Sequence, residues 1–221
     1  ASGAFSIIGE EIFLPLGGQR VFIEVRLAGW GPQHLKTWQA KIDSSGYQNG
    51  VSSIGPAVQS CTADSQCVQA FGSGSGCRVA TPKGNICEAG FQDKTHPDWI
   101  GFGVEVISAV AISTPDFRFG LTTILPDFIE DSGESRYGGT LVLDVPAGAA
   151  GTFVVGMVRN ETFMNDDTLP DFKEIPIDLL VPARITIGEP LVPKNRYLAF
   201  TPGNPGHQTA VRVTLKSLYH P

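Results

Sequence analysis

The chain has 221 residues, of which 42% are hydrophobic and only 17% charged, and its formal net charge is −6 at pH 7. This acidic balance lacks the basic stripe that displaces phosphate counterions, so we expect no nucleic-acid partner. Glycine or polar residues interrupt every long apolar run, so we expect no membrane span. The 26 glycines and 16 prolines imply many turns, and low charge with frequent turns favours an all-β extracellular domain.

Two strand patterns lie in the first fifty residues. Apolar residues alternate with more polar ones over 21–27, which predicts a strand with one buried face. A second strand is expected over 35–42, with Trp38 in its interior. Residues 47–50 then offer a turn before the cysteines begin.

The later strands are expected at 104–112, 117–125, 139–145, 151–158, 175–179 and 183–187. The first two are predicted to form a hairpin through a four-residue connection, and the next two form the best-defined pair. Residues 151–158 are apolar on both faces, which predicts a strand covered on two sides. No segment has helical spacing over three turns without Gly or Pro, so no helix is expected.

About eight or nine short strands separated by turns predict two packed antiparallel sheets, a β-sandwich of the jelly-roll or Greek-key type. We expect this sandwich to occupy residues 1–188. Residues 189–221 are expected to form a Pro-rich connector and a β-hairpin. Because a hairpin alone is rarely stable in water, it either docks on the sandwich or begins a further β domain.

All four cysteines, Cys61, Cys67, Cys77 and Cys87, lie in one Gly-rich window. Two disulfides are the favoured interpretation, which predicts a stapled loop insert at 61–87 in a secreted or cell-surface protein. Three connectivities remain open. A zinc site is the alternative, although the cysteines lack the short spacing typical of zinc knuckles.

The strand patterns at 21–27, 35–43, 139–148 and 151–156 resemble the cohesin-like family, over roughly residues 5–187. This resemblance implies a jelly-roll sandwich related to some carbohydrate-binding modules. It also implies recognition of proteins, dockerin modules in the best-known cases, without catalysis.

The cysteine window is followed by Asp98-Trp-Ile-Gly, the segment 113–119 and the hairpin 193–206. Together they resemble the cohesin-like part of large secreted proteins of planctomycete-type bacteria, in which such an insert is present and more β structure follows. An ordinary cohesin lacks this disulfide loop. Fold therefore carries over from the resemblance better than function does.

No catalytic residues are expected. The histidines are scattered through turn-like segments and are interpreted as surface residues: His34, His96, His207 and His220. The segment Gly72–Gly76 matches a nucleophile elbow poorly, because it lies between cysteines and precedes no helix. It matches no phosphate-binding loop either.

Calcium is the one cofactor that the sequence raises, because loop carboxylates and carbonyls can supply its oxygen ligands. The first candidate set is Asn165, Asp166, Asp167 and Asp171, and a weaker set is Asp127, Glu130, Asp131 and Glu134. Neither follows the spacing of an EF-hand loop. Solvated turn acids are the alternative interpretation.

Exposed aromatic rings that stack on sugars are the second candidate site. Trp30 lies at a strand end between two glycines, and Tyr47 and Tyr137 lie near expected turns. Trp38 is assigned to the core and Trp99 to packing beneath the cysteine loop, since large aromatic side chains are most often buried.

The favoured function is a non-catalytic extracellular or cell-surface module that contacts another protein or copies of itself. One alternative is a carbohydrate-binding module of a secreted polysaccharide-degrading system. Another is a structural subunit of an envelope or filament. Exposed strand edges or apolar patches would distinguish an assembly subunit, and coplanar exposed aromatics would distinguish a sugar binder.

Overall fold

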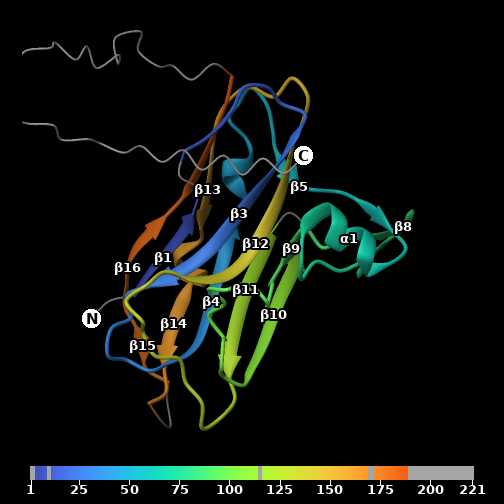
Figure 1. The fold of residues 1–221 in the computed structure, drawn as a ribbon. Coiled ribbons are helices and arrows are strands. Elements are labelled where there is room, and N and C mark those ends of the chain that lie inside the picture. Colours follow the sequence, from blue (N-terminus) through green and yellow to red (C-terminus); the bar gives the residue numbers. More distant parts are fainter. Residues whose placement is uncertain (1–2, 9–10, 114–115, 169–171, 189–221) are drawn as a thin grey trace, which may run out of the picture. The chain divides into compact units, whose positions relative to one another are not determined.

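The computed structural model describes residues 3–8, 11–113, 116–168 and 172–188. The expected connector and hairpin at 189–221 lie outside the described residues, so the prediction of a further domain stays a prediction. The described residues form a two-sheet β-sandwich with an insert that carries the cysteines (Figure 1). The expected fold class is confirmed.

One sheet has six strands. Its order across the sheet is β16 (Ile177–Val181), β1 (Gly3–Ile8), β3 (Gln19–Ala28), β12 (Arg136–Val145) and β5 (Gly55–Pro56), and β9 (Gly90–Phe91) also pairs with β12. The ladder between β3 and β12 is antiparallel over nearly the full length of both strands. These two strands form the centre of the sheet.

The second sheet has eight strands. Its order is β10 (Val106–Ser113), β11 (Asp116–Thr123), β4 (Leu35–Asp43), β13 (Gly151–Met157), β17 (Ala183–Ile187) and β2 (Ile12–Leu14). β14 (Phe163–Asp166) also pairs with β4, and β15 (Glu174–Ile175) pairs with β14. Two short 3-10 helices, η1 (Ser44–Tyr47) and η2 (Arg159–Glu161), follow β4 and β13.

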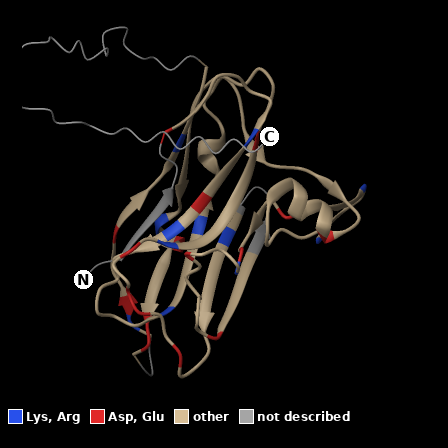
Figure 2. Ribbon diagram, in the orientation of Figure 1, with Lys and Arg blue, Asp and Glu red and all other residues tan. Residues whose placement is uncertain are grey.

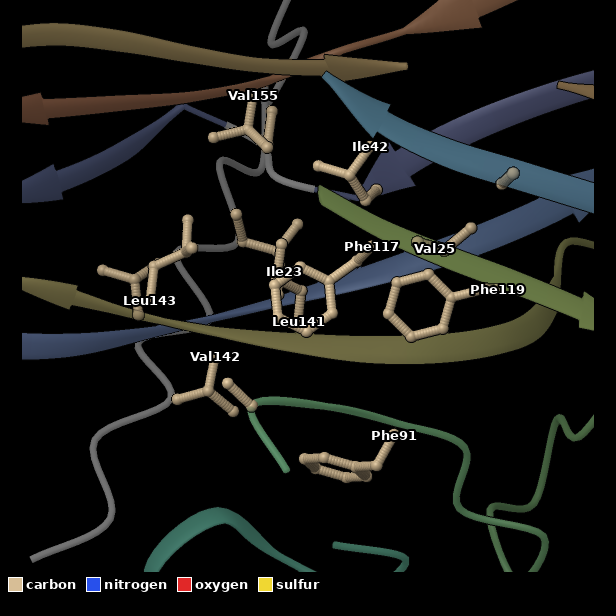
Figure 3. Packing of buried hydrophobic residues seen from close by; sticks show 14 of the residues in the cluster. Ile23, Val25, Ile42, Phe91, Phe117, Phe119, Leu141, Val142, Leu143 and Val155 are labelled. Carbon is tan, nitrogen blue, oxygen red and sulfur yellow. The ribbon is translucent and has the colours of Figure 1, made fainter. Parts of the chain in front are cut away.

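The core lies between the two sheets and follows the alternation of the sequence. Every second residue of β3 from Val21 to Leu27 is buried, and Phe117, Phe119 and Leu121 of β11 face them from the other sheet. Figure 3 shows Phe117 and Phe119 beside Ile23 and Leu141. A strand with period-two alternation can bury one face only, which is why this pattern locates the core.

Close sheet packing requires small residues at one point. A β-carbon at Gly138 would lie 2.8 Å from atoms of both Leu27 and Trp38. A β-carbon at Gly139 would overlap the ring of Phe119. A β-bulge at these glycines shifts the β12–β3 register, and their lack of side chains leaves room for the aromatic rings.

Two strand predictions were right in position and wrong in pairing. β12 and β13 are not partners, because β12 pairs with β3 and β13 pairs with β17 and β4 in the other sheet. The connection at 146–150 therefore crosses from sheet to sheet. β13 is also covered on one face only, since Val154 is 38% exposed while Phe153 and Val155 are buried.

The hairpin of β10 and β11 is confirmed, but its ladder extends further than expected. Ser113 pairs with Asp116, so the connection is shorter than four residues. The prolines at 176 and 182 separate β15, β16 and β17, as expected of residues that lack a backbone N–H.

The N-terminal strands contribute to both sheets. β1 pairs parallel with β16, and β2 pairs parallel with β17. The expected sheets were purely antiparallel, so these two parallel pairs are a correction. They arise because β1 and β2, at the start of the sandwich, run in the same direction as their neighbours β16 and β17, at its end.

Candidate functional site: the disulfide-stapled insert

The four cysteines form two interleaved disulfides, Cys61–Cys77 and Cys67–Cys87. The thiolates that a zinc site requires are therefore consumed, and the zinc interpretation is wrong for this state of the protein. The Sγ atoms of Cys61, Cys67 and Cys87 all lie within 4.8 Å of one another. The two bonds are thus packed together as the centre of the insert.

The insert contains an α-helix, α1 (Asp64–Phe71), which the sequence analysis did not expect. Cys67 and Phe71 lie one turn apart and are both buried, so the helix presents one narrow apolar face. Asp64 lies in its first turn, and Gly72 ends it with a φ of 105°. At eight residues the helix is too short for a three-turn pattern, and the disulfide at Cys67 compensates for that shortness.

A small three-stranded sheet completes the insert, with the order β6 (Ser60–Cys61), β8 (Gly84–Ile86) and β7 (Val79–Thr81). Between this sheet and the start of α1 lies an open hollow of about 570 Å³, lined among others by Ser60, Thr62, Gln66, Lys83 and Asn85. Polar and apolar atoms line it about equally, and it is open to solvent. It therefore offers hydrogen-bonding groups to a partner but no enclosed cavity for a small apolar ligand.

Backbone hydrogen bonds attach the two segments that flank the insert to β12. The amide of Ala57 donates to the carbonyl of Val142 at 2.9 Å, and the amide of Val142 donates to the carbonyl of Ala89 at 2.7 Å. The Val142 side chain points to the insert, away from Ile23 and Leu143, and is fully buried (Figure 3). The insert therefore covers one part of the outer face of the six-stranded sheet.

Arg20 of β3 fixes the helix to the same face. Its guanidinium lies 5.0 Å from the centre of the Phe71 ring, a cation–π contact. Arg20 also pairs with Asp144 at 2.9 Å and donates to Gln59 at 3.2 Å. The inner side of the insert is thus held by specific contacts, while its other side faces solvent.

The charged groups of the insert interact with one another. Arg78 lies between Glu88 at 3.9 Å and Asp64 at 4.0 Å, and Asp64 accepts a hydrogen bond from the Cys77 amide at 2.7 Å. Burial raises the pKa of the Glu88 carboxyl, although Arg78 and a backbone hydrogen bond from Gly76 act against this rise. Over the rest of the described chain, charged residues are spread across loops and outer faces and form no basic stripe (Figure 2).

The aromatic residues proposed for sugar stacking are all buried, so that prediction is wrong. Trp30 is inaccessible to solvent, and its indole N–H donates to the Ile129 carbonyl at 3.2 Å. Tyr47 is 4% exposed. Tyr137 is 1% exposed, and burial raises the pKa of its phenol despite a hydrogen bond with Thr140. Large rings at strand ends close the ends of the core here rather than projecting from it.

The expected burial of the other two tryptophans is confirmed. Trp38 and Trp99 are 1% and 3% exposed. Trp99 also packs at 6.1 Å from the Tyr137 ring.

The first calcium set is only partly described, because Asp171 lies outside the described residues. Asp166 is buried, and its Oδ1 accepts the amides of Thr168 and Lys173, each at 3.0 Å. Burial tends to raise the pKa of Asp166, but these hydrogen bonds together hold that pKa below its usual value. Asp167 instead pairs with His34 at 3.1 Å, and Asn165 lies in the ladder of β14. Calcium binding at these residues stays a prediction.

The second acidic set supports loops. Asp131 accepts the amides of Gly31 at 2.6 Å and Gly133 at 2.8 Å, and Asp127 accepts the amide of Glu105 at 3.0 Å. Among the described residues, neither acidic set brings three carboxylates to within ligand distance of one another.

Two histidines are described, and both stack on aromatic rings. His34 lies 3.7 Å from the Phe128 ring, and His96 lies 4.3 Å from the Tyr137 ring. His96 also lies 3.8 Å from Glu24. His207 and His220 lie outside the described residues. The polar partners of these histidines are Asp167 for His34, and Glu24 and the Asp98 amide for His96, so a Ser–His–Asp arrangement does not form around them.

A second open hollow of about 440 Å³ lies beside η2 and β14, with Arg159, Asn160, Phe163, Asn165 and Glu174 in its walls. It is shallow, and Glu174 is the one carboxylate that lines it. A glycosidase-type pair of acids is therefore not assembled there.

No described helix has the length and apolar character needed to cross a bilayer.

The fold and geometry define a β-sandwich with a docked, doubly stapled insert. No protein-family model matches the sequence, and no curated protein matches it. The solved structures to which it is similar include the seventh ScaB type I cohesin from Pseudobacteroides cellulosolvens, at 9% identity and a TM-score of 0.46, over 85% of this chain and 96% of that chain. The cohesin CaCohA2 from Clostridium acetobutylicum is 12% identical, with a TM-score of 0.43, over 85% and 93%.

A non-cellulosomal cohesin from the archaeon Archaeoglobus fulgidus is 6% identical, with a TM-score of 0.44, over 85% of this chain and 91% of that chain. These structures belong to the family that the strand patterns resemble. The resemblance to secreted proteins of planctomycete-type bacteria stays a prediction.

Proposed function

We propose that this protein is a non-catalytic module that recognises another protein, and that the insert is its recognition surface. One observation carries the proposal: the insert is rigidly docked on one side and free on the other. Phe71 of the insert contacts Arg20, and the flanking residues 57 and 89 bond to β12, whereas Val68 of α1 is 44% exposed. Exposed apolar side chains on a pre-ordered scaffold are typical of binding surfaces.

We expect the sandwich to form its core without the insert, although Cys61, Cys67, Phe71 and Cys87 pack onto the same continuous cluster of buried residues. The buried residues between the sheets come from β3, β4, β11, β12, β13 and β17, all of which lie outside 61–87. Two disulfides in so short a segment therefore stabilise the insert itself rather than the sandwich. Two disulfides that hold so short a segment rigid are best explained by the surface that the segment presents, because a rigid surface loses less conformational entropy on binding.

Two further arguments support the proposal. Disulfides persist in oxidising compartments, which favours an extracellular or cell-surface location. The family resemblance points to protein recognition without catalysis. The carbohydrate alternative is weaker than the sequence suggested, because Trp30, Tyr47 and Tyr137 offer no exposed ring face.

Site-specific photocrosslinking tests the proposal. A benzoylphenylalanine at Val68, on the exposed side of α1, is compared with one at Val154, which has similar exposure on the outer face of β13. Each variant is irradiated with the secreted proteins of the source organism. We expect a polypeptide adduct at position 68 that is absent at position 154 and disappears when the disulfides are reduced first.

Equal labelling at both positions, or labelling at 154 alone, would remove the insert as the recognition surface. Retention of the protein on cellulose or chitin, abolished by Val68→Asp, would instead favour the carbohydrate-binding alternative.

A further inference from the structure

The eight-stranded sheet ends at β10, whose outer edge has no partner strand among the described residues. β10 pairs with β11 over its whole length without a bulge. The Glu105 carbonyl accepts the Ile124 amide at 2.9 Å, so the odd-numbered residues of β10 direct their backbone groups toward β11. The even-numbered residues therefore direct theirs to the open edge: Val106, Ser108, Val110 and Ile112.

The other strands that end a sheet are short or guarded, as is usual in β-proteins. β16 carries Asp178 between two flanking prolines, and β2 has three residues followed by Pro15. β5 and β9 have two residues each. β10, which Figure 1 shows beside β11, has eight residues, Val-Ile-Ser-Ala-Val-Ala-Ile-Ser, with no charge and no proline. A long, regular, neutral edge is a template for another strand.

We propose that β10 is a self-association edge, at which the β10 of a second copy adds antiparallel across a twofold axis. Pairing all four outward residues with their counterparts places Val106 opposite Ile112, Ser108 opposite Val110, and Ala109 opposite itself. Directly opposed backbones at such a non-hydrogen-bonded position approach to about 4.5 Å between α-carbons, where alanine fits. The register is thus set by the length of the strand.

The chemistry of β10 favours its own copy as the occupant. A twofold axis places identical residues close together, so a charge near the axis would face its own like charge. The eight residues of β10 carry none. Because β10 is the one long unguarded edge in the described part of the chain, its use leaves a closed dimer rather than an open filament. Ile107, 65% exposed on the outer face, lies two residues from the axis and gains cover from the second copy.

This inference concerns a different surface from the insert, so its failure leaves the proposed recognition function untouched. The test is sedimentation equilibrium of the full chain over a range of concentrations. Ala109→Lys places two lysines opposite each other, and Ala109 is exposed, so the fold tolerates the change. We expect its dimer to be at least about tenfold weaker than wild type.

The matched control is Thr122→Lys, which adds the same charge on the exposed face of β11, one strand in from the edge. It should leave dimerisation unchanged. Mixing Ala109→Lys with Ala109→Glu should restore dimers as a charge-paired heterodimer. In wild type, the amides of Ser108 and Val110 should exchange more slowly as concentration rises, while the Ala109 amide, already bonded to β11, should not change.

A wild type that stays monomeric up to millimolar concentration would overturn the proposal. So would an equal loss of dimer in the position-109 and position-122 variants.

Discussion

Removal of both disulfides should unfold the insert and leave the sandwich folded. The change is Cys→Ala at all four cysteines, since alanine places no hydroxyl at the buried positions 61, 67 and 87. The bonds close loops with sequence separations of 16 and 20 residues. Each is worth about 3 kcal/mol by restriction of the unfolded chain, and the interleaved pair is worth less than twice that.

The free energy of unfolding of the sandwich should fall by less, because the sandwich loses only its contacts with the insert. The main one is the burial of Val142, worth about 1.5 to 3 kcal/mol. For a domain of this size that corresponds to a fall in Tm of roughly 3 to 12 °C. The unfolding of the insert itself is local and precedes the main transition.

Hydrogen exchange followed by mass spectrometry distinguishes the two regions. In the four-alanine variant, the amides of Ala57 and Val142, which join the flanks of the insert to β12, should lose protection, as should the amide of residue 87, which bonds Gln59 at the base of the insert. The amides of Ile23 and Val25 in β3 should keep it. Variants lacking one bond each should show intermediate effects. Loss of protection in β3 at the same rate as in the insert would refute the reasoning, because the insert would then be integral to the fold.

Three further predictions concern packing, titration and ligands. Gly139→Ala should destabilise the protein by about 1 to 3 kcal/mol in urea unfolding, because the added methyl group overlaps the Phe119 ring. Gly55→Ala, with open space around the added methyl group, should destabilise it far less. Equal effects of the two substitutions would contradict the packing argument. Asp166→Asn should cost about 1 kcal/mol at neutral pH by weakening the hydrogen bonds from Thr168 and Lys173. The folded-state pKa of Asp166 is lowered, so the stability that its carboxylate contributes is present above the ordinary value of 3.8 and is lost as pH falls through the folded pKa. The Tm difference between wild type and variant should therefore close at acid pH. A Tm difference that stays constant with pH would exclude this origin. Wild type should pass unretained through cellulose and chitin columns, since Trp30, Tyr47 and Tyr137 are buried, and the calcium prediction is tested by a rise in Tm with millimolar Ca²⁺ that Asp167→Ala abolishes.

Strand positions could be predicted because alternation is a local property. The patterns at 21–27 and 35–42 became β3 and β4 almost residue for residue, since period-two burial is visible in any half-buried strand. Which strands pair with one another was harder to predict from the sequence. A five-residue connection such as 146–150 serves equally well for a hairpin or for a crossing between sheets, so β12 and β13 were wrongly paired.

The candidate site shows the same division. The clustered cysteines predicted a stapled insert, and the insert exists. Helix α1 was missed because its buried face consists of only Cys67 and Phe71, two residues that carry no three-turn periodicity. Trp30 was expected to be exposed at a strand end, but exposure depends on what packs above a residue, here the 129 carbonyl and its loop.

The sequence by itself determined that this is an all-β chain with a disulfide-stapled insert, because alternation, turn residues and cysteine clustering act over a few neighbouring residues. Only the tertiary structure decided which cysteines pair, which face of the sheet the insert covers, and which strand edge stays open. Those properties depend on segments far apart in the chain. Val142 is hydrogen-bonded through its backbone to residues 57 and 89, which flank the insert, and β10 is an edge because no described strand continues the sheet beyond it.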